Sequence, residues 1–347
     1  MNKLLLFGCF ICLVNGYIQP ALISIGDWGG YALGGYHQQN VQFVATAMYK
    51  KSRTTNLTAI LNTGDNFYYC GIQNITDFQI KRDYIDLFSM MNKPWYNTLG
   101  NHDYGYNVTA QVELSNVLKN WIMPDRFYWQ QIDLGSGIVV NLIVLDTNPC
   151  VSAYRSADKS GWDPCGVKYP TCSINHTDDD FEGPCQFHTN IIEQNCTVQY
   201  EWFKDVLTTI LSEDPERHQW NIVMGHHPID EIDEVDFTSY IESEFIDLYI
   251  NGHQHDLEHY TMVSGKGKYI TTGAGSMVKP TTTSDDDFNN EKKEKGKHKR
   301  KILWKAKETG YTIHYFNSTE TITTNFMNVQ NEIIYNFITS KAIRKTH

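Results

Sequence analysis

Short apolar runs alternate with segments of helical periodicity along the first third of the chain. Apolar runs occupy residues 21–25, 59–63 and 95–99, and each ends in a glycine followed by a polar residue. Between them, residues 38–51 and 77–91 have helical character, with apolar side chains three or four residues apart. This strand–helix–strand order predicts a largely parallel sheet with right-handed connections.

The later part of the chain continues this pattern and then changes it. We expect strands over residues 138–145, 221–224 and 248–250, and a helix over residues 198–211. Three further runs are typical of antiparallel strands: residues 269–272, 310–316 and 321–327. Together these elements predict an α/β layered domain with helices outside the sheets.

Two segments interrupt the pattern. Residues 150–196 hold five cysteines and the acidic run 178–180 with little periodicity, which predicts a disulfide-linked surface insert. Residues 281–301 begin with threonines and aspartates and end in a lysine-rich run, which predicts a solvated, mobile loop. Alternatively, this loop contacts anionic partners or is cleaved by proteases.

The first 16 residues are typical of a signal peptide. Lys3 precedes the uncharged stretch 4–14, and small or neutral residues precede the expected cleavage point. The stretch is too short to span a bilayer, which takes about 20 residues; the alternative is a buried N-terminal strand. The tail 331–347 is short and polar, so we expect no permanent membrane anchor. Residues 17–347 are expected to form one domain.

Cysteine and glycosylation patterns also indicate export. Six cysteines follow residue 16, namely Cys70, Cys150, Cys165, Cys172, Cys185 and Cys196. An even number suits disulfides in an oxidising compartment, although the sequence leaves their pairing open. The cysteine spacings lack the close Cys-x2-4-Cys pairs of zinc ribbons, which argues against a zinc site in this cluster. Six Asn-X-Ser/Thr acceptors begin at Asn56, Asn74, Asn107, Asn175, Asn195 and Asn317. We therefore expect a glycoprotein that is secreted or reaches a lysosome or vacuole.

Composition narrows the range of partners. With 347 residues, of which 41% are hydrophobic, the chain can bury a large core. Its net charge of −11 argues against nucleic acid as a partner, because no overall positive field attracts phosphate backbones. We expect a monomer.

Metal-binding residue types gather at the ends of the predicted strands. They lie in Gly26-Asp27, Gly64-Asp65-Asn66-Phe67-Tyr68, Gly100-Asn101-His102, Val223-Met224-Gly225-His226 and Gly252-His253-Gln254-His255. Carboxyl ends of strands in α/β sheets converge on one crevice. Two carboxylates, a phenol, an amide oxygen and three imidazoles suit two metal ions, which can clamp a phosphoryl group. Singly, each motif also fits a turn residue or a core histidine; the ordered set predicts one dinuclear site.

These motifs resemble those of the purple acid phosphatases, and the flanking segments SIGDWGG, LNTGDNFYYCG and PWYNTLGNHDY resemble the small animal type. The resemblance is dense over residues 21–149 and returns over residues 199–277. It implies a four-layer α/β/β/α metallophosphoesterase sandwich of two mixed sheets flanked by helices. It also implies an acid phosphatase in which hydroxide generated at the metals attacks phosphate monoesters of small molecules or phosphoproteins.

The resemblance also implies a role for each site residue. Iron(III) would be bound by Asp27, Tyr68 and His255, a divalent iron, zinc or manganese ion by Asn101, His226 and His253, and both by Asp65. This division suits the chemistry, because phenolate and carboxylate are hard anionic ligands whereas amide and imidazole are neutral. His102 is expected to contact phosphate or protonate the leaving group.

The chain also departs from that family. The small animal enzymes have a second histidine about nine residues after the Val-x-x-His histidine, but residues 233–236 are acidic or apolar. Proton delivery then rests on His102 alone, or an acidic residue substitutes. His227 is a weaker alternative to His226 because it does not fit the Val-x-x-His spacing. In the family the loop after the strand ending near Asp146 represses activity, but here insert 150–196 is longer and its regulatory role is open. Trp28 and Tyr69 are expected in the core rather than at the site rim.

Two other functions fit the same scaffold. One is a phosphodiesterase or nucleotide hydrolase with the same metal set and different rim loops. The other is a non-catalytic scaffold, since some parasite membrane-complex anchors resemble this family. Those anchors usually lack some metal ligands and carry a C-terminal membrane helix, whereas this chain keeps all seven candidate ligands.

Overall fold

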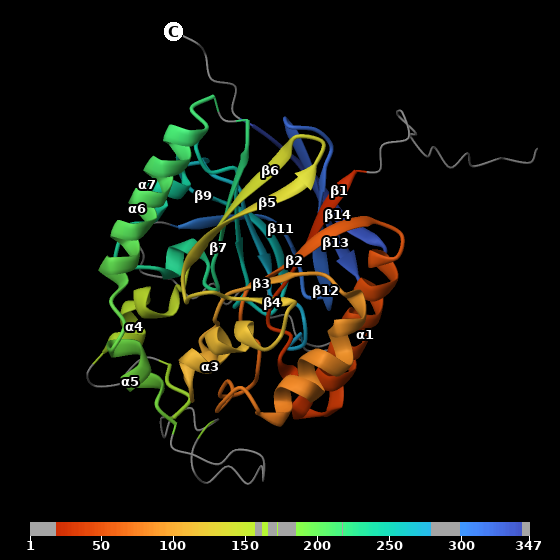
Figure 1. The fold of residues 1–347 in the computed structure, drawn as a ribbon, viewed down its shortest axis with the longest axis vertical. Helices are drawn as coiled ribbons and strands as arrows, with labels where there is room; N and C mark the ends of the chain where they lie inside the picture. The colour runs from red at the N-terminus through yellow and green to blue at the C-terminus, as the bar shows by residue number, and fades with distance from the viewer. Residues whose placement is uncertain are drawn as a thin grey trace, which may run out of the picture.

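Two mixed sheets form the centre of the protein (Figure 1). The computed structural model describes residues 19–156, 162–165, 172, 185–216, 218–278 and 299–341. The expected signal peptide and most of the expected charged loop lie outside these residues.

In the described part of the chain, the first sheet has the strand order β14-β13-β12-β1-β2-β3-β4. Its strands are β1 (Pro20–Ile25), β2 (Asn56–Asn62), β3 (Trp95–Asn97), β4 (Trp121–Ile122), β12 (Gly310–Phe316), β13 (Thr321–Asn328) and β14 (Ile333–Ser340). The strands β1 to β4 are parallel, as their alternation with helices predicts. The three C-terminal strands extend this sheet in antiparallel pairing.

The second sheet has the order β11-β9-β10-β8-β7-β6-β5. Its strands are β5 (Tyr128–Gly135), β6 (Ile138–Val144), β7 (Trp220–Met224), β8 (Leu248–Asn251), β9 (Leu257–Met262), β10 (Tyr269–Thr272) and β11 (Arg300–Ala306). The strands β6, β7, β8 and β10 run parallel, and the other three pair antiparallel.

The long helices lie on the outer faces of the two sheets, and several short helices lie beyond one end of the strands (Figure 1). The α-helices are α1 (Gly35–Ser52), α2 (Asp86–Phe88), α3 (Val108–Glu113), α4 (Ser152–Arg155), α5 (Phe187–Ile192), α6 (Cys196–Glu213) and α7 (Thr238–Ile241). Short 3-10 turns span η1 (Gly30–Leu33), η3 (Ser89–Met91), η4 (His102–Tyr104), η5 (Leu114–Asn116), η6 (Asn148–Cys150) and η7 (Ile229–Glu231). The segment η2 (Ile80–Ile85) is a π-helix.

Alternating side chains of β6 show how the layers pack. Val140 and Leu142 join the core between the two sheets, whereas Ile143 joins the cluster that contains Phe203 and Ile210 of α6. Successive strand residues point to opposite faces, so β6 is buried on both sides. The structure thus confirms the expected four-layer sandwich of two mixed sheets flanked by helices.

Several sequence expectations need correction. The expected helix over residues 77–91 is divided into a π-helix, a short α-helix and a 3-10 turn. The tail that begins at residue 331 was expected to be short and polar, and no strand was predicted there, but residues Ile333–Ser340 form edge strand β14. Insert 150–196 has the disulfides expected of it, but its described part also contains helices α4 and α5, which the lack of periodicity did not predict.

Three disulfides answer the pairing question that the sequence left open. Cys150–Cys196 closes the base of the insert, Cys165–Cys185 lies within it, and Cys70–Cys172 ties it to the loop that follows β2. Among the helices that can be described, none is both long and apolar enough to cross a membrane.

Candidate metal centre

The eight residues predicted for the site come together where loops from both sheets meet. In the first sheet, Asp27 follows β1, Asp65 and Tyr68 follow β2, and Asn101 and His102 follow β3. In the second sheet, β7 is followed by His226, and β8 by His253 and His255. Donor atoms of Asp27, Asp65 and His226 all lie within 4.8 Å of one another.

One group of donors surrounds the Tyr68 hydroxyl. Its Oη lies 2.9 Å from Oδ2 of Asp65, 3.2 Å from Oδ1 of Asp27 and 3.3 Å from Nε2 of His255. A phenol has a single proton, which cannot satisfy both carboxylates at once. Asp27 and Tyr68 are fully buried, so the surplus of lone pairs has no bulk water to solvate it. A cation would satisfy this group.

A second group surrounds the Asn101 side-chain oxygen. It lies 2.9 Å from Nε2 of His226 and 3.0 Å from Nδ1 of His253. Each ring has its other nitrogen next to an acceptor: Nδ1 of His226 lies 2.8 Å from the Thr63 carbonyl, and Nε2 of His253 lies 3.2 Å from Glu231.

These outer contacts determine where the ring protons lie. A carbonyl and a carboxylate only accept, so each imidazole in its neutral form donates to its outer partner and turns a lone pair toward Asn101. Burial lowers the pKa of His226, so this ring is neutral, whereas Glu231 outweighs burial and raises the pKa of His253. When His253 is also neutral, two nitrogen lone pairs and an amide oxygen converge without a proton between them. Neutral nitrogen and oxygen donors of this kind fit a divalent cation.

Asp65 connects the two groups. Its Oδ2 contacts Tyr68, while its Oδ1 lies 3.5 Å from Nε2 of His226 and accepts a hydrogen bond of 3.0 Å from the backbone N–H of His102. The burial of this carboxyl would raise its pKa, but the neighbouring His226 and His102 outweigh burial and hold the pKa at about 2. Burial and the charge of Asp65 instead raise the pKa of Asp27. The single carboxylate of Asp65 is placed to serve both groups.

The backbone is strained at the same positions. Asp27, Asp65 and His253 have φ angles of 57°, 54° and 67°, in the left-handed region that costs a non-glycine residue about 1–3 kcal/mol. Close approach also requires glycine at residue 100, where a Cβ atom would lie 2.0 Å from Oδ1 of Asp65. Strain that gathers at strand ends is typical of a functional site.

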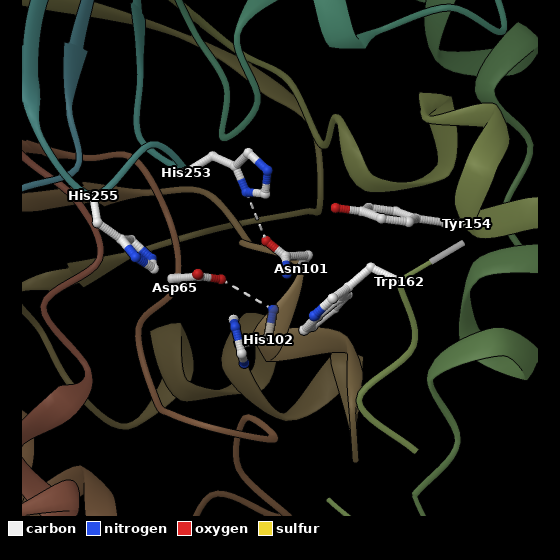
Figure 2. A pocket seen from close by; sticks show the side chains of 7 residues that line it. All are labelled: Asp65, Asn101, His102, Tyr154, Trp162, His253 and His255. Atoms are coloured by element: carbon white, nitrogen blue, oxygen red, sulfur yellow. Dashed lines mark hydrogen bonds between the residues drawn. The ribbon is translucent and has the colours of Figure 1, made fainter. Parts of the chain in front are cut away.

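A cavity of about 240 Å³ opens beside these donors (Figure 2). It is lined by Asp65, Asn101, His102, Tyr154, Trp162, His253 and His255. His102 donates from Nδ1 to the Tyr69 carbonyl at 2.8 Å, which leaves Nε2 without a hydrogen-bond partner in the described structure. Burial lowers the pKa of His102.

The cysteine-rich insert supplies an aromatic wall of this cavity. The Trp162 ring packs edge-on against His102, with centroids 4.8 Å apart, and also contacts Tyr154 and Phe187. Tyr154 and Phe187 are buried, so this part of the insert belongs to the core around the site. No motif in the sequence indicated either cavity aromatic, because their position depends on disulfides and packing.

His227 lies beside the predicted donors but is engaged elsewhere. One ring atom each of His226, His227 and His253 lie within 4.8 Å of one another. However, Nδ1 of His227 contacts Thr147 at 2.8 Å, and its Nε2 contacts Tyr154 at 3.0 Å. Its neighbour His226 instead faces Asn101, in agreement with the Val-x-x-His spacing.

Two acidic residues near the site were missed by sequence reasoning. Asp103 accepts hydrogen bonds from the backbone N–H groups of Gly100 and Asn66, and so ties two donor loops together; its place directly after the Gly-Asn-His motif was the available signal. Glu231 contacts His253 as described above. Of the two aromatics weighed earlier, Trp28 lies in the core, whereas the half-buried Tyr69 contacts the site through its carbonyl.

Comparison with known proteins agrees with this geometry. The sequence profile described as calcineurin-like phosphoesterase matches residues 22–257. Human tartrate-resistant acid phosphatase type 5 is 27% identical over 276 residues, which are 76% of this chain and 75% of the relative. Purple acid phosphatase 4 of Arabidopsis thaliana is 30% identical over 274 residues, which are 74% of this chain and 68% of the relative.

Solved structures share the fold at lower identity. The GAP50 anchor in the inner membrane complex of Plasmodium has a TM-score of 0.61 at 20% identity and covers 95% of this chain and 91% of its own. Purple acid phosphatase PPD1 from yellow lupin seeds has a TM-score of 0.53 at 11% identity, with 93% and 54% covered. At these identities the likeness concerns the fold alone.

Proposed function

Because the chain belongs to the calcineurin-like phosphoesterase family, with purple acid phosphatases among its relatives, we propose that it is an acid phosphatase that hydrolyses phosphate monoesters at a dinuclear metal centre. The observation that carries this proposal is the convergence of oxygen and nitrogen donors in two groups that share Asp65, with fewer protons than lone pairs between them. Burying so many polar atoms without partners costs free energy, and bound cations would remove that cost.

The donor chemistry supports a mixed-valence pair. We assign iron(III) to Asp27, Tyr68 and His255, a divalent iron, zinc or manganese ion to Asn101, His226 and His253, and Asp65 to both. Phenolate and carboxylate suit a trivalent ion, whereas amide and imidazole suit a divalent one. When bound, the pair would supply a hydroxide nucleophile at mildly acidic pH and neutralise charge on the phosphoryl oxygens.

The protein's own residues then bind and orient the ester. His102 holds Nε2 free toward the cavity while Nδ1 is fixed by Tyr69. In its protonated form it donates a hydrogen bond to a phosphoryl oxygen or a proton to the leaving oxygen. Trp162 packs against the ring and fixes its orientation. The aromatic rings of Tyr154 and Trp162 line one side of the cavity.

We also propose that the protein is exported. The N-terminal segment is typical of a signal peptide, three disulfides are present, and four glycosylation acceptors, Asn56, Asn74, Asn107 and Asn195, are exposed. These features support a secreted or lysosomal glycoprotein. The monomeric state and small-molecule or phosphoprotein substrates remain part of the same proposal.

A metal analysis with a visible spectrum tests the centre directly. We expect two metal ions per chain and a visible absorption band from tyrosinate bound to iron(III). Tyr68→Phe should abolish the band, and Asp65→Asn should lower hydrolysis by more than about a hundredfold, because even changes outside the ligand set cost 10–100-fold.

Tyr128→Phe is the matched control, since its hydroxyl binds the Asn97 and Ile122 carbonyls away from the cavity. It should leave colour and rate unchanged. Full activity in Asp65→Asn would refute the assignment. Rates on aryl monoesters and bis-aryl diesters distinguish the phosphodiesterase alternative, and no hydrolysis of either would favour a scaffold.

A further inference from the structure

Tyr154 is a polar group in the cavity that the proposed chemistry does not yet use. It lies on α4 within the insert, and its hydroxyl faces the side of the cavity where Asn101 and His253 lie (Figure 2). Its ring is held by Phe187 and His227, with centroid distances of 5.3 and 5.5 Å. Packing on both sides fixes the direction of the hydroxyl.

A hydrogen-bond chain behind Tyr154 begins at Thr147. The Thr147 hydroxyl oxygen accepts from the backbone N–H groups of His226 at 3.2 Å and of His227 at 3.1 Å. These two bonds occupy both lone pairs of a hydroxyl. Its third contact, 2.8 Å from Nδ1 of His227, must therefore use the hydroxyl proton. Thr147 is the donor in that bond.

The tautomer of His227 follows from this. Because Nδ1 accepts a hydrogen bond, it carries no proton, and the neutral ring has its proton on Nε2. That proton lies in the 3.0 Å contact with the Tyr154 hydroxyl, so His227 donates and Tyr154 accepts. The phenol proton of Tyr154 is then directed elsewhere, and in the described structure this hydroxyl has no second protein partner.

We infer that Tyr154 is a substrate-binding residue whose hydroxyl donates a hydrogen bond to a phosphoryl oxygen, and that His227 and Thr147 position it for that role. This inference rests on the proposed function. The donor comes from the insert, whereas the phosphatases that the chain resembles have a second histidine that this chain lacks. Unlike a histidine, the phenol supplies a neutral donor that is fixed by a directed chain.

The test compares Tyr154→Phe with the wild type in the metal-loaded, full-length protein. The variant keeps the ring and removes only the hydroxyl. We expect the inhibition constant of inorganic phosphate to rise about tenfold to a hundredfold, the range for a lost hydrogen bond to a charged group. For an aryl phosphate, kcat/KM should fall at least about tenfold, with metal content and the visible band unchanged. Tyr128→Phe, which loses a buried hydroxyl outside the cavity, should leave both constants at wild-type values.

A double-mutant cycle tests the positioning chain. His227→Leu removes the donor that directs Tyr154, so its loss of phosphate affinity should not add to that of Tyr154→Phe in the double variant. Fully additive losses would show that His227 acts independently and would overturn this chain. Unchanged phosphate inhibition in Tyr154→Phe, with a normal wild type, would overturn the inference alone. A wild type that neither binds metal nor hydrolyses esters would overturn the proposed function as well.

Discussion

At the scale of single residues, the site depends on acceptors placed behind its histidines. Glu231 contacts Nε2 of His253 at 3.2 Å and also accepts hydrogen bonds from Gln254 at 2.8 Å and Arg300 at 3.3 Å. Burial would raise the pKa of Glu231, but His253 and Arg300 outweigh it and lower the pKa. A carboxylate in this position fixes both the tautomer and the ring orientation of a metal-binding histidine.

Glu231→Gln therefore tests whether Glu231 supports metal binding by orienting His253. The amide keeps the size of the side chain but removes the charge that faces His253. We expect the affinity for the divalent ion to fall about 10–100-fold while the trivalent site keeps its colour. Competition with a chelator, followed by metal analysis, measures the change.

The exposed Glu244 offers the matched control, because Glu244→Gln removes the same charge from the surface. Equal metal affinity in both variants would mean that Glu231 only stabilises the fold.

Sequence reasoning located the donors at this scale but not their supports. Asp27, Asp65 and Asn101 each follow a glycine at the end of an apolar run, so local pattern alone placed them near one another. Glu231 and Tyr154 lack such a signal. Glu231 becomes recognisable only once η7 lies beside His253, which follows β8. Tyr154 becomes recognisable only once α4 lies beside His227, which follows β7.

At the scale of elements, the described parts of the insert act as a wall rather than a loose loop. Cys165–Cys185 joins the segment that carries Trp162 to the start of α5, and Phe187 packs on the Trp162 ring. The insert thus positions both cavity aromatics through a covalent link across 20 residues of sequence.

Replacing both Cys165 and Cys185 by serine should loosen this wall. In the chain-entropy description, a link across that span stabilises the folded state by about 3 kcal/mol. We expect a lower unfolding temperature and, because Trp162 no longer fixes His102, a lower kcat on aryl phosphates with unchanged metal content. Calorimetry and steady-state kinetics measure the two effects. If the double serine variant were less stable but kept the wild-type kcat, the Cys165–Cys185 disulfide would have a structural role only.

Edge strands account for most of the strands that sequence analysis missed. In β14, Ile333 and Ile338 are exposed while Thr339 is buried, so no clear apolar face marks the strand. Buried strands such as β6 were predicted because burial on both faces favours a nearly continuous apolar run, which in β6 is interrupted only by Asn141. An edge strand is instead defined by the neighbour with which it pairs, and that neighbour is not encoded locally.

At the scale of the whole molecule, the candidate centre lies where loops that follow strands of both sheets meet. The donors Asp27, Asp65, Tyr68 and Asn101 follow strands of the first sheet, and His226, His253 and His255 follow strands of the second. Cations bound by both sets would therefore link the two halves of the sandwich.

Metal removal should consequently destabilise the entire fold and not only the loops. Binding to the folded state alone adds about 4 kcal/mol when the free ligand is at a thousand times its dissociation constant. We expect the chelated protein to unfold at a lower temperature, and zinc or iron to restore the transition in a concentration-dependent way. Asp65→Asn removes the shared ligand, so added metal should stabilise that variant far less. If the metal-free wild type unfolded at the same temperature as the loaded protein, the sheets would be held together by their apolar core alone.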